Sequence, residues 1–165
     1  MNFSSEFIIA NLPLNWKDVL WGYRHKLIGW RTPVDIAVAR TTDGQLNDPL
    51  VDELSVVDKD SVWRVGEILD ELAEQVETSD EFSKKRWLYL SLLLLQESVG
   101  DQAMKLQGIE EIYTDFDYPE EIAGFVPYMP STDGFDPGKH TFAENCDRIM
   151  AKLNRYLEET KLWLV

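Results

Sequence analysis

Residues 85–98 read KRWLYLSLLLLQES, and the run WLYLSLLLL inside them, at 87–95, decides the fold. Its apolar side chains would occupy every side of a helix, whereas a helix at the surface needs a polar side. The sequence therefore predicts a buried central helix, which begins at Asp80 after a cap at Ser79 and ends near Ser98. The run is shorter than the roughly 20 apolar residues that span a membrane, so no membrane insertion is expected.

Helical patterns also surround this segment, because apolar residues recur three and four positions apart between cap and stop signals. The expected helices cover 3–12, 16–28 between a cap at Asn15 and a stop at Gly29, 33–41 behind a cap at Thr32, 61–76, 101–113 behind a cap at Asp101, and a last helix behind a capping box of Thr141 and Glu144. The buried face of this last helix is expected to hold Phe142, Cys146, Ile149, Leu153 and Leu157. Turn-forming residues over 43–60 predict an exposed connection with a helical turn near 51–54. No period-two alternation competes, so we predict an all-α, single-domain helical bundle over residues 1–165.

The charge of the chain is large and uneven. The formal net charge is −14, yet residues 1–40 hold five basic residues against three acidic ones, so the remainder carries −16. Such a surface repels phosphate backbones and attracts basic proteins, so we expect no nucleic-acid partner. The single cysteine, Cys146, excludes an intramolecular disulfide and suits a reducing compartment. With no basic leader before a long apolar run, the expected location is the cytoplasm.

The segment at 113–130, YTDFDYPEEIAGFVPYMP, combines acidic and aromatic residues with no basic residue among them. Like charges cannot pair with one another, so they face water or a partner, and aromatic rings often anchor protein partners. The candidate partner-binding residues here are Asp115, Asp117, Tyr118, Glu120 and Glu121. Two other interpretations stay open: a divalent cation held by Asp115 and Asp117, and a short helix that begins at Pro119.

A second acidic group lies on the helix expected at 61–76. Its apolar stripe places Val65, Leu69 and Leu72 on one side. The opposite side carries Glu67, Asp70, Glu71, Glu74 and Glu77. Such a strip is either a solvated surface or a second partner site, for which Glu67, Asp70, Glu71 and Glu74 are the candidates.

Residues with recognisable chemistry are few. The two histidines, His25 and His140, lie in no metal-ligand spacing with Cys146. The chain has no phosphate-binding glycine loop and no nucleophile elbow. We therefore assign no catalytic residue, no metal and no cofactor. The basic group near Arg24 and Arg31 is left with two explanations, an anion or the protein's own acidic face.

Three strings carry a resemblance to a known family: WKDVLWGYRHKLIGWRTPVDIA at 16–37, KRWLYLSLLLLQES at 85–98 and YTDFDYPEEI within 113–130. They resemble the bacterial family called domain of unknown function 2247, over nearly the whole chain. The resemblance implies a small cytoplasmic helical protein without an assigned catalytic residue. Some members of that family look like immunity proteins encoded beside secreted polymorphic or contact-dependent toxins.

Two classes of function follow from these features. The first is an immunity protein that binds a cognate toxin domain, a basic nuclease, through its acidic surface. The second is an enzyme of unrecognised type that uses carboxylates in a pocket between helices. An adaptor in a larger assembly is a third possibility. The neighbouring gene distinguishes the first two, since a large secreted protein indicates immunity and a metabolic operon indicates catalysis.

Overall fold

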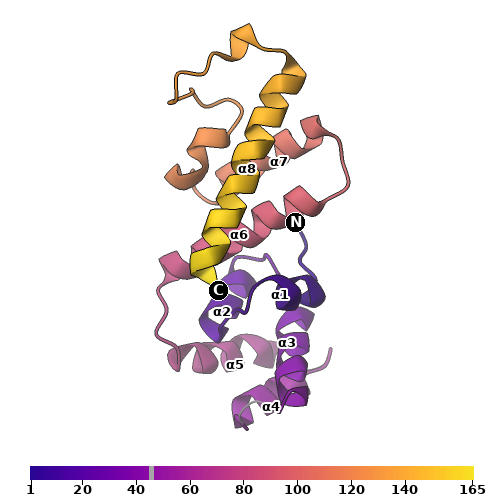
Figure 1. The fold of residues 1–165 in the computed structure, drawn as a ribbon. Coiled ribbons are helices and arrows are strands. Elements are labelled where there is room, and N and C mark those ends of the chain that lie inside the picture. The colour runs from indigo at the N-terminus through magenta and orange to yellow at the C-terminus, as the bar shows by residue number, and fades with distance from the viewer. Residues whose placement is uncertain (45–46) are drawn as a thin grey trace. The chain divides into compact units, whose positions relative to one another are not determined.

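The computed structural model of the protein describes residues 1–44 and 47–165. Every regular element in these two ranges is a helix, which confirms the all-α prediction (Figure 1). Gln45 and Leu46, which fall inside the connection predicted over 43–60, lie outside the described residues. The internal contacts divide the chain into two compact units: unit 1, Met1–Trp87, and unit 2, Leu88–Val165.

Unit 1 contains five complete helices and the first part of a sixth among its described residues. They are α1 (Ser5–Asn11), α2 (Trp16–Arg24), α3 (Arg31–Thr42), α4 (Pro49–Ser55), α5 (Trp63–Glu74) and the beginning of α6 (Asp80–Glu97). The helix α3 packs against α4 and α1, while α5 packs against α2 and α4. Their apolar faces bury side chains such as Ile8, Val19, Leu54 and Leu69. The turn expected near 51–54 is present within α4, behind a cap at Asp48.

The helix α2 begins as predicted and ends earlier. Asn15 caps it in a capping box with Asp18. The chain leaves the helix after Arg24 because Lys26 adopts a left-handed conformation, with φ of 60°. The amide of Leu27 then donates to the carbonyl of Gly22 at 2.9 Å, which is the Schellman closure that normally uses glycine. The stop predicted at Gly29 was wrong. The helix ends at Arg24, and Lys26 takes the left-handed conformation that glycine usually adopts at a helix end.

The start of α3 also differs from the prediction. The helix begins at Arg31, and the residue before it, Trp30, makes no side-chain cap. Thr32, the predicted cap, is buried inside the first turn. Pro33 is tolerated there because the first amides of a helix have no intrahelical acceptor.

The helix α6 confirms the expected burial over most of the apolar run. Its start is capped as predicted, since the amide of Phe82 donates to Ser79 Oγ at 3.1 Å. All six side chains of 87–92 are buried, whereas those of 93–95 are half-buried. The boundary between the two units falls within this helix, after Trp87. No helix among the described residues is long and apolar enough to cross a membrane.

Unit 2 contains the rest of α6, followed by α7 (Gln102–Asp115), the 3-10 helices η1 (Glu120–Phe125) and η2 (Pro137–Lys139), and α8 (Phe142–Leu164). The helix α8 packs against η1 and α7. Asp101 caps α7 as predicted. Thr141 caps α8, but the side chain of Glu144 bonds His140 Nδ1 at 2.9 Å instead of completing the predicted box.

The buried face of α8 agrees with the expected spacing except at its beginning. Cys146, Leu153 and Leu157 are buried and Ile149 is half-buried, whereas Phe142 is 66% exposed. A helical side chain lies over the turn that precedes its own Cα, and the first residue of a helix has no such turn to cover. The prediction that Phe142 belongs to the buried face was therefore wrong.

Asp133 anchors the loop that leads into α8. Its carboxylate accepts hydrogen bonds from Ser131 Oγ, from Arg148 at 2.5 Å and from the amide of Phe135 at 3.2 Å, and Lys152 Nζ lies 2.9 Å away. These contacts, with the bonds from Ser131, Lys152 and Arg148 as the largest causes, hold the pKa of Asp133 well below its usual range. The loop is therefore tied to α8 by an ionised carboxylate.

Candidate functional site

The segment around the end of α7 is shaped by two residues in the left-handed conformation. Asp117 and Tyr118 have φ of 60° and 58°. The amide of Tyr118 donates to the carbonyl of Tyr113 at 2.8 Å and that of Asp117 to Thr114 at 3.2 Å, which closes α7 in a Schellman turn. Asp115 is the last residue of the helix. The acidic residues of this segment thus flank a tight helix end.

The next element is the short helix that Pro119 predicted. It forms as the 3-10 helix η1, with Glu120 and Glu121 in its first turn, where carboxylates are favoured by the helix dipole. Its apolar residues Ile122 and Phe125 are buried. The ring of Phe125 lies 5.6 Å from that of Tyr156 on α8. Burial raises the pKa of Tyr156, and the charge of Glu121 adds to that rise.

The aromatic residues of the segment divide between core and surface. Tyr113, Phe116 and Phe125 are each 5% exposed. Tyr118 and Tyr128, in contrast, are 60% and 55% exposed. Their rings lie 5.3 Å and 6.1 Å from the buried ring of Tyr113. Two tyrosines are therefore held at the surface by a third that is fixed in the core.

The exposed face of α7 adds two carboxylates, Glu110 and Glu111, that are not among the predicted partner-binding residues. A shallow groove of about 550 Å³ is lined by Glu110, Glu111, Asp115 and Tyr128, together with Gln107 and Thr114. Glu111 and Asp115 are four residues apart on one helix and therefore share a face. That spacing was the signal available in the sequence. We call these six residues the α7 groove.

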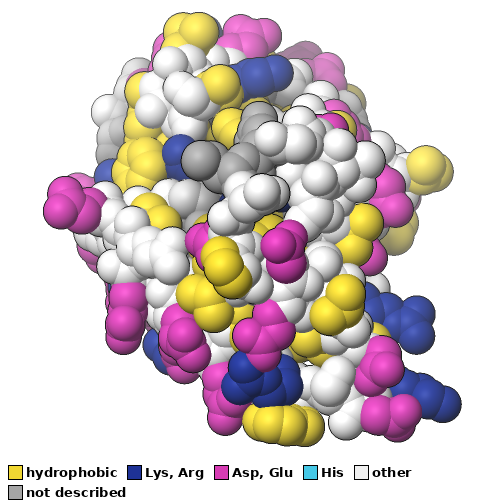
Figure 2. Space-filling model, turned by 90° about the horizontal axis from the view of Figure 1, so that it is seen from below, with side chains coloured by type: hydrophobic (Ala, Val, Ile, Leu, Met, Phe, Trp, Pro, Cys, Tyr) yellow, Lys and Arg dark blue, Asp and Glu magenta, His cyan; other side chains and the backbone are white. Residues whose placement is uncertain are grey.

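All nine predicted partner-binding residues are exposed. Asp115, Asp117, Tyr118, Glu120 and Glu121 belong to unit 2, whereas Glu67, Asp70, Glu71 and Glu74 belong to unit 1. The structure brings the first five together around the end of α7 and the other four together along α5. Figure 2 shows how widely acidic side chains are spread over one face, with Lys and Arg side chains beside several of them.

The strip on α5 is partly neutralised within unit 1. Asp70 forms an ion pair with Arg24 of α2, and Glu67 accepts from Arg64 at 2.7 Å. The first of these pairs agrees with the idea that the basic group near Arg24 meets the protein's own acidic face. Glu71 and Glu74 are the two strip residues on α5 for which the described part of the chain offers no ion pair.

A buried carboxylate network in unit 1 was not foreseen from the sequence. Asp18, with no exposed surface, accepts from Ser83 Oγ at 2.7 Å and from Arg86 at 2.6 Å. Its backbone carbonyl accepts from the indole of Trp87 at 2.7 Å. These contacts join α2 to α6 through residues of two of the strings quoted above. The network indicates that Asp18, Arg86 and Trp87 have a structural role, because Asp18 has no exposed surface at which a ligand could reach it.

In the described part of the chain, neither histidine bonds to or stacks on a predicted partner-binding residue or a residue of the Asp18 network. His25 stacks on Trp21 with ring centres 3.7 Å apart, and His140 bonds Glu144. Within residues 1–44 and 47–165, no group of three or more His, Cys, Asp or Glu side chains is placed to hold a metal ion.

The described residues thus form an all-helical protein with exposed acidic and aromatic groups and a buried carboxylate network. Residues 4–161 match the family described as "Uncharacterized protein conserved in bacteria (DUF2247)". The chain belongs to this family, as the three strings indicated. No curated protein and no solved structure shows significant similarity to the chain.

Proposed function

We propose that this protein is a cytoplasmic immunity protein that binds and neutralises a cognate secreted bacterial toxin domain, and that this domain is a basic nuclease. The observation that carries the proposal is the surface at the end of α7. There, four exposed acidic residues flank exposed Tyr118, and the α7 groove adds Glu110 and Glu111 beside exposed Tyr128.

Charge and aromatic surface have separate roles in such a complex. Carboxylates spread over a surface imitate a polyanionic substrate and accelerate the approach of a basic partner. Tyrosines that are held rigidly at the surface provide contact area at little cost in conformational entropy, and they slow dissociation. Tyr118 and Tyr128 meet this requirement, since both pack on the buried ring of Tyr113.

The α7 groove also offers carboxylates that the fold leaves uncompensated. Among the described residues, neither Glu111 nor Asp115 forms an ion pair with a lysine or arginine. Glu111 accepts a hydrogen bond from the side-chain amide of Gln107 at 3.0 Å. A basic side chain of the toxin would therefore gain a partner here without breaking an existing pair.

The test is coexpression with the C-terminal domain of the secreted protein encoded beside this gene. We expect the protein to restore growth and to form a complex whose association rate falls as salt rises. If the neighbouring gene encodes no such toxin, or if coexpression gives no protection, the proposal is wrong.

A matched pair of double charge reversals locates the interface. Glu111→Lys with Asp115→Lys alters the α7 groove, and Glu71→Lys with Glu74→Lys makes the same change in net charge on α5. The first pair should weaken binding about tenfold or more, because close charge pairs across an interface couple by roughly 1.5 kcal/mol or more. The second should change mainly the association rate. The reverse pattern would move the interface to α5 and leave the immunity function standing.

A further inference from the structure

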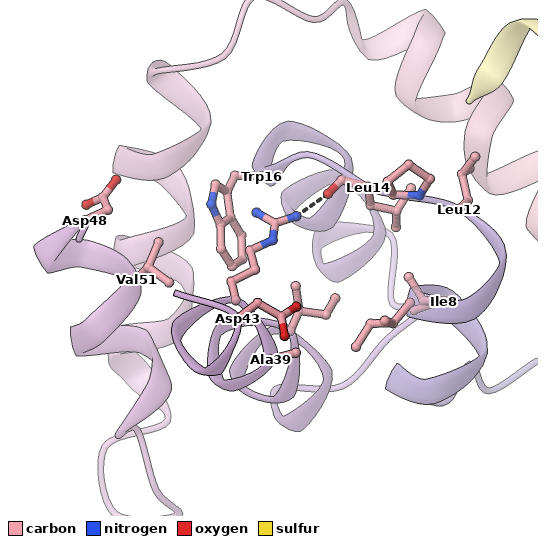
Figure 3. Close-up of a pocket in the computed structure, with 12 residues that line it drawn as sticks. Ile8, Leu12, Leu14, Trp16, Ala39, Asp43, Asp48 and Val51 are labelled. Carbon is pink, nitrogen blue, oxygen red and sulfur yellow. Dashed lines mark hydrogen bonds between the residues drawn. The ribbon is translucent and has the colours of Figure 1, made fainter. Parts of the chain in front are cut away.

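A cavity of about 390 Å³ lies among α1, α2, α3 and α4 of unit 1 (Figure 3). Its walls are aliphatic side chains that include Ile8, Leu12, Leu14, Ile36 and Val51. Small-ligand pockets have volumes of roughly 300–1,000 Å³ and are mostly apolar with a few placed polar groups. The volume and walls of this cavity therefore fit a small molecule.

One cation lines this apolar cavity. The guanidinium of Arg40 lies over the ring of Trp16, 4.2 Å from its centre, and donates to the carbonyl of Leu14, the bond drawn as a dashed line in Figure 3. Arg40 forms no ion pair with any carboxylate of the described residues. Burial lowers the pKa of Arg40, and the charge of Asp18 opposes that fall.

Arg40 is half-buried and has no ion-pair partner among the described residues, and even partial removal of a charge from water raises the free energy of the empty site. A guanidinium has five N–H donors in a planar fork that suits a carboxylate. The carbonyl of Leu14 occupies one donor. A carboxylate that enters the cavity would both use the remaining donors and neutralise the charge.

The walls restrict the rest of the ligand. Most of them are aliphatic side chains, and the ring of Trp16, which is buried, has Arg40 over one face. An aliphatic chain therefore fits better than an aromatic ring, which would find no open ring to stack on. Asp43 and Asp48 also line the cavity, and their negative charges weaken the binding of any anion, so that a ligand with two acidic groups is disfavoured more than one with a single carboxylate.

We propose that this cavity is a binding site for a small aliphatic monocarboxylate, whose carboxylate pairs with Arg40 and whose chain lies among the aliphatic walls. The site shares no residue with the toxin-binding surface proposed above, and either proposal can fail without the other. It adds a small-molecule ligand to a protein for which only a protein partner is otherwise expected.

Calorimetric titration with three probes of equal chain length tests the charge requirement: octanoate, octanol and octylammonium. The protein has a net charge of −14, so unspecific attraction favours the ammonium. We expect octanoate to bind about tenfold or more tightly than octanol and octylammonium to bind least. If octylammonium binds as well as octanoate, the proposal is wrong.

Variants show whether the cavity is the binding site. Arg40→Gln should remove the preference for octanoate over octanol, but it also removes a contact with Trp16. Ala39→Trp fills the cavity and leaves Arg40 in place, and it should abolish binding of octanoate. Val38→Trp is the matched control, since Val38 is 44% exposed on the same helix and does not line the cavity. If the two tryptophan variants bind octanoate equally, the ligand lies elsewhere.

A third variant should improve binding. Asp43 is an exposed acid at the C-terminal end of α3, where a negative charge is unfavourable to the helix. Asp43→Asn should therefore preserve the fold and tighten octanoate binding severalfold while leaving octanol unchanged. A purely structural role of Arg40 predicts no such difference between the two probes, so an equal effect on both would overturn the proposal.

Discussion

Two glycines in unit 1 should respond in opposite ways to the same substitution. A Cβ added at Gly22 of α2 would lie 2.2 Å from the ring of Trp87, whereas one added at Gly66 of α5 would meet only Tyr23, at 3.8 Å. Trp87 cannot move aside easily. It is fully buried, its indole donates to the carbonyl of Asp18, and its ring meets Phe3 edge-on at 5.3 Å.

The magnitudes follow from two opposing effects. Replacing glycine by alanine inside a helix stabilises it by about 1 kcal/mol. Overpacking a dense core costs roughly 1–3 kcal/mol, and a contact of 2.2 Å belongs at the upper end of that range. Gly66→Ala should therefore raise the free energy of unfolding by up to about 1 kcal/mol, while Gly22→Ala should lower it by about 1–2 kcal/mol.

Urea unfolding followed by circular dichroism measures both changes. With slopes of roughly 1–3 kcal/mol per M, the two midpoints should differ by about 1 M or more. Gly66→Ala serves as the control for the helix-propensity gain, because its new methyl group makes an ordinary contact. Equal midpoints for the two variants would show that Trp87 does not pack against Gly22, and the contact between α2 and α6 would have to be revised.

Three further changes test the core and one anchored loop. Leu92→Ala should cost about 2–5 kcal/mol in urea unfolding because Leu92 has no exposed surface, and a loss below 1 kcal/mol would contradict this burial. Arg86→Met removes the counterion of buried Asp18 and should cost about 3–5 kcal/mol in the same assay; an unchanged midpoint would show that Ser83 and Asn15 suffice. The lowered pKa of Asp133 means that its stabilising contribution is present above about pH 4 and is lost as the pH falls toward its folded pKa. Asp133→Asn should therefore reduce the acid dependence of unfolding between about pH 4 and pH 2, and an unaltered pH profile would count against the anchor.

The helical fold was predictable because it depends on periodic burial. The apolar stripe that begins at Val65 fits one buried side of a helix, and the apolar run of α6 fits a helix that is buried on every side. Caps such as Asn15 and Asp101 were also readable, because their side chains bond amides three residues away. Each of these signals depends on residues a few positions apart, so it can be recognised without knowing how the helices pack.

Helix ends without a side-chain signal were not predictable. Lys26 and Tyr118 take the left-handed conformation that glycine usually adopts, and nothing in their residue types indicates it. The backbone bonds of the Schellman turn offset the cost of this conformation. The stop placed at Gly29 illustrates the error, since composition indicated a glycine and the fold used a lysine.

The candidate sites were predictable only as exposed surfaces. The helical phase correctly placed Glu71 and Glu74 on the outside of α5, but pairing across helices, such as Asp70 with Arg24, depends on a distance that the sequence does not contain. The same holds for the cavity beside Arg40, whose walls come from four helices. Sequence periodicity predicts which side of a single helix is exposed, whereas a site is formed by side chains from several helices.

The segment at the end of α7 assigns folding and binding to different residues, and this separation makes the proposed function testable. Tyr113 and Phe116 are buried, so their substitution would act first on stability. Asp115 and Glu111 are exposed and, among the described residues, form no ion pair with a lysine or arginine, so charge reversal there should leave the free energy of unfolding within about 0.5 kcal/mol. A loss of toxin binding by a variant of normal stability would then report contact with a partner. A loss of toxin binding that accompanies unfolding would show only that the substituted residue stabilises the end of α7.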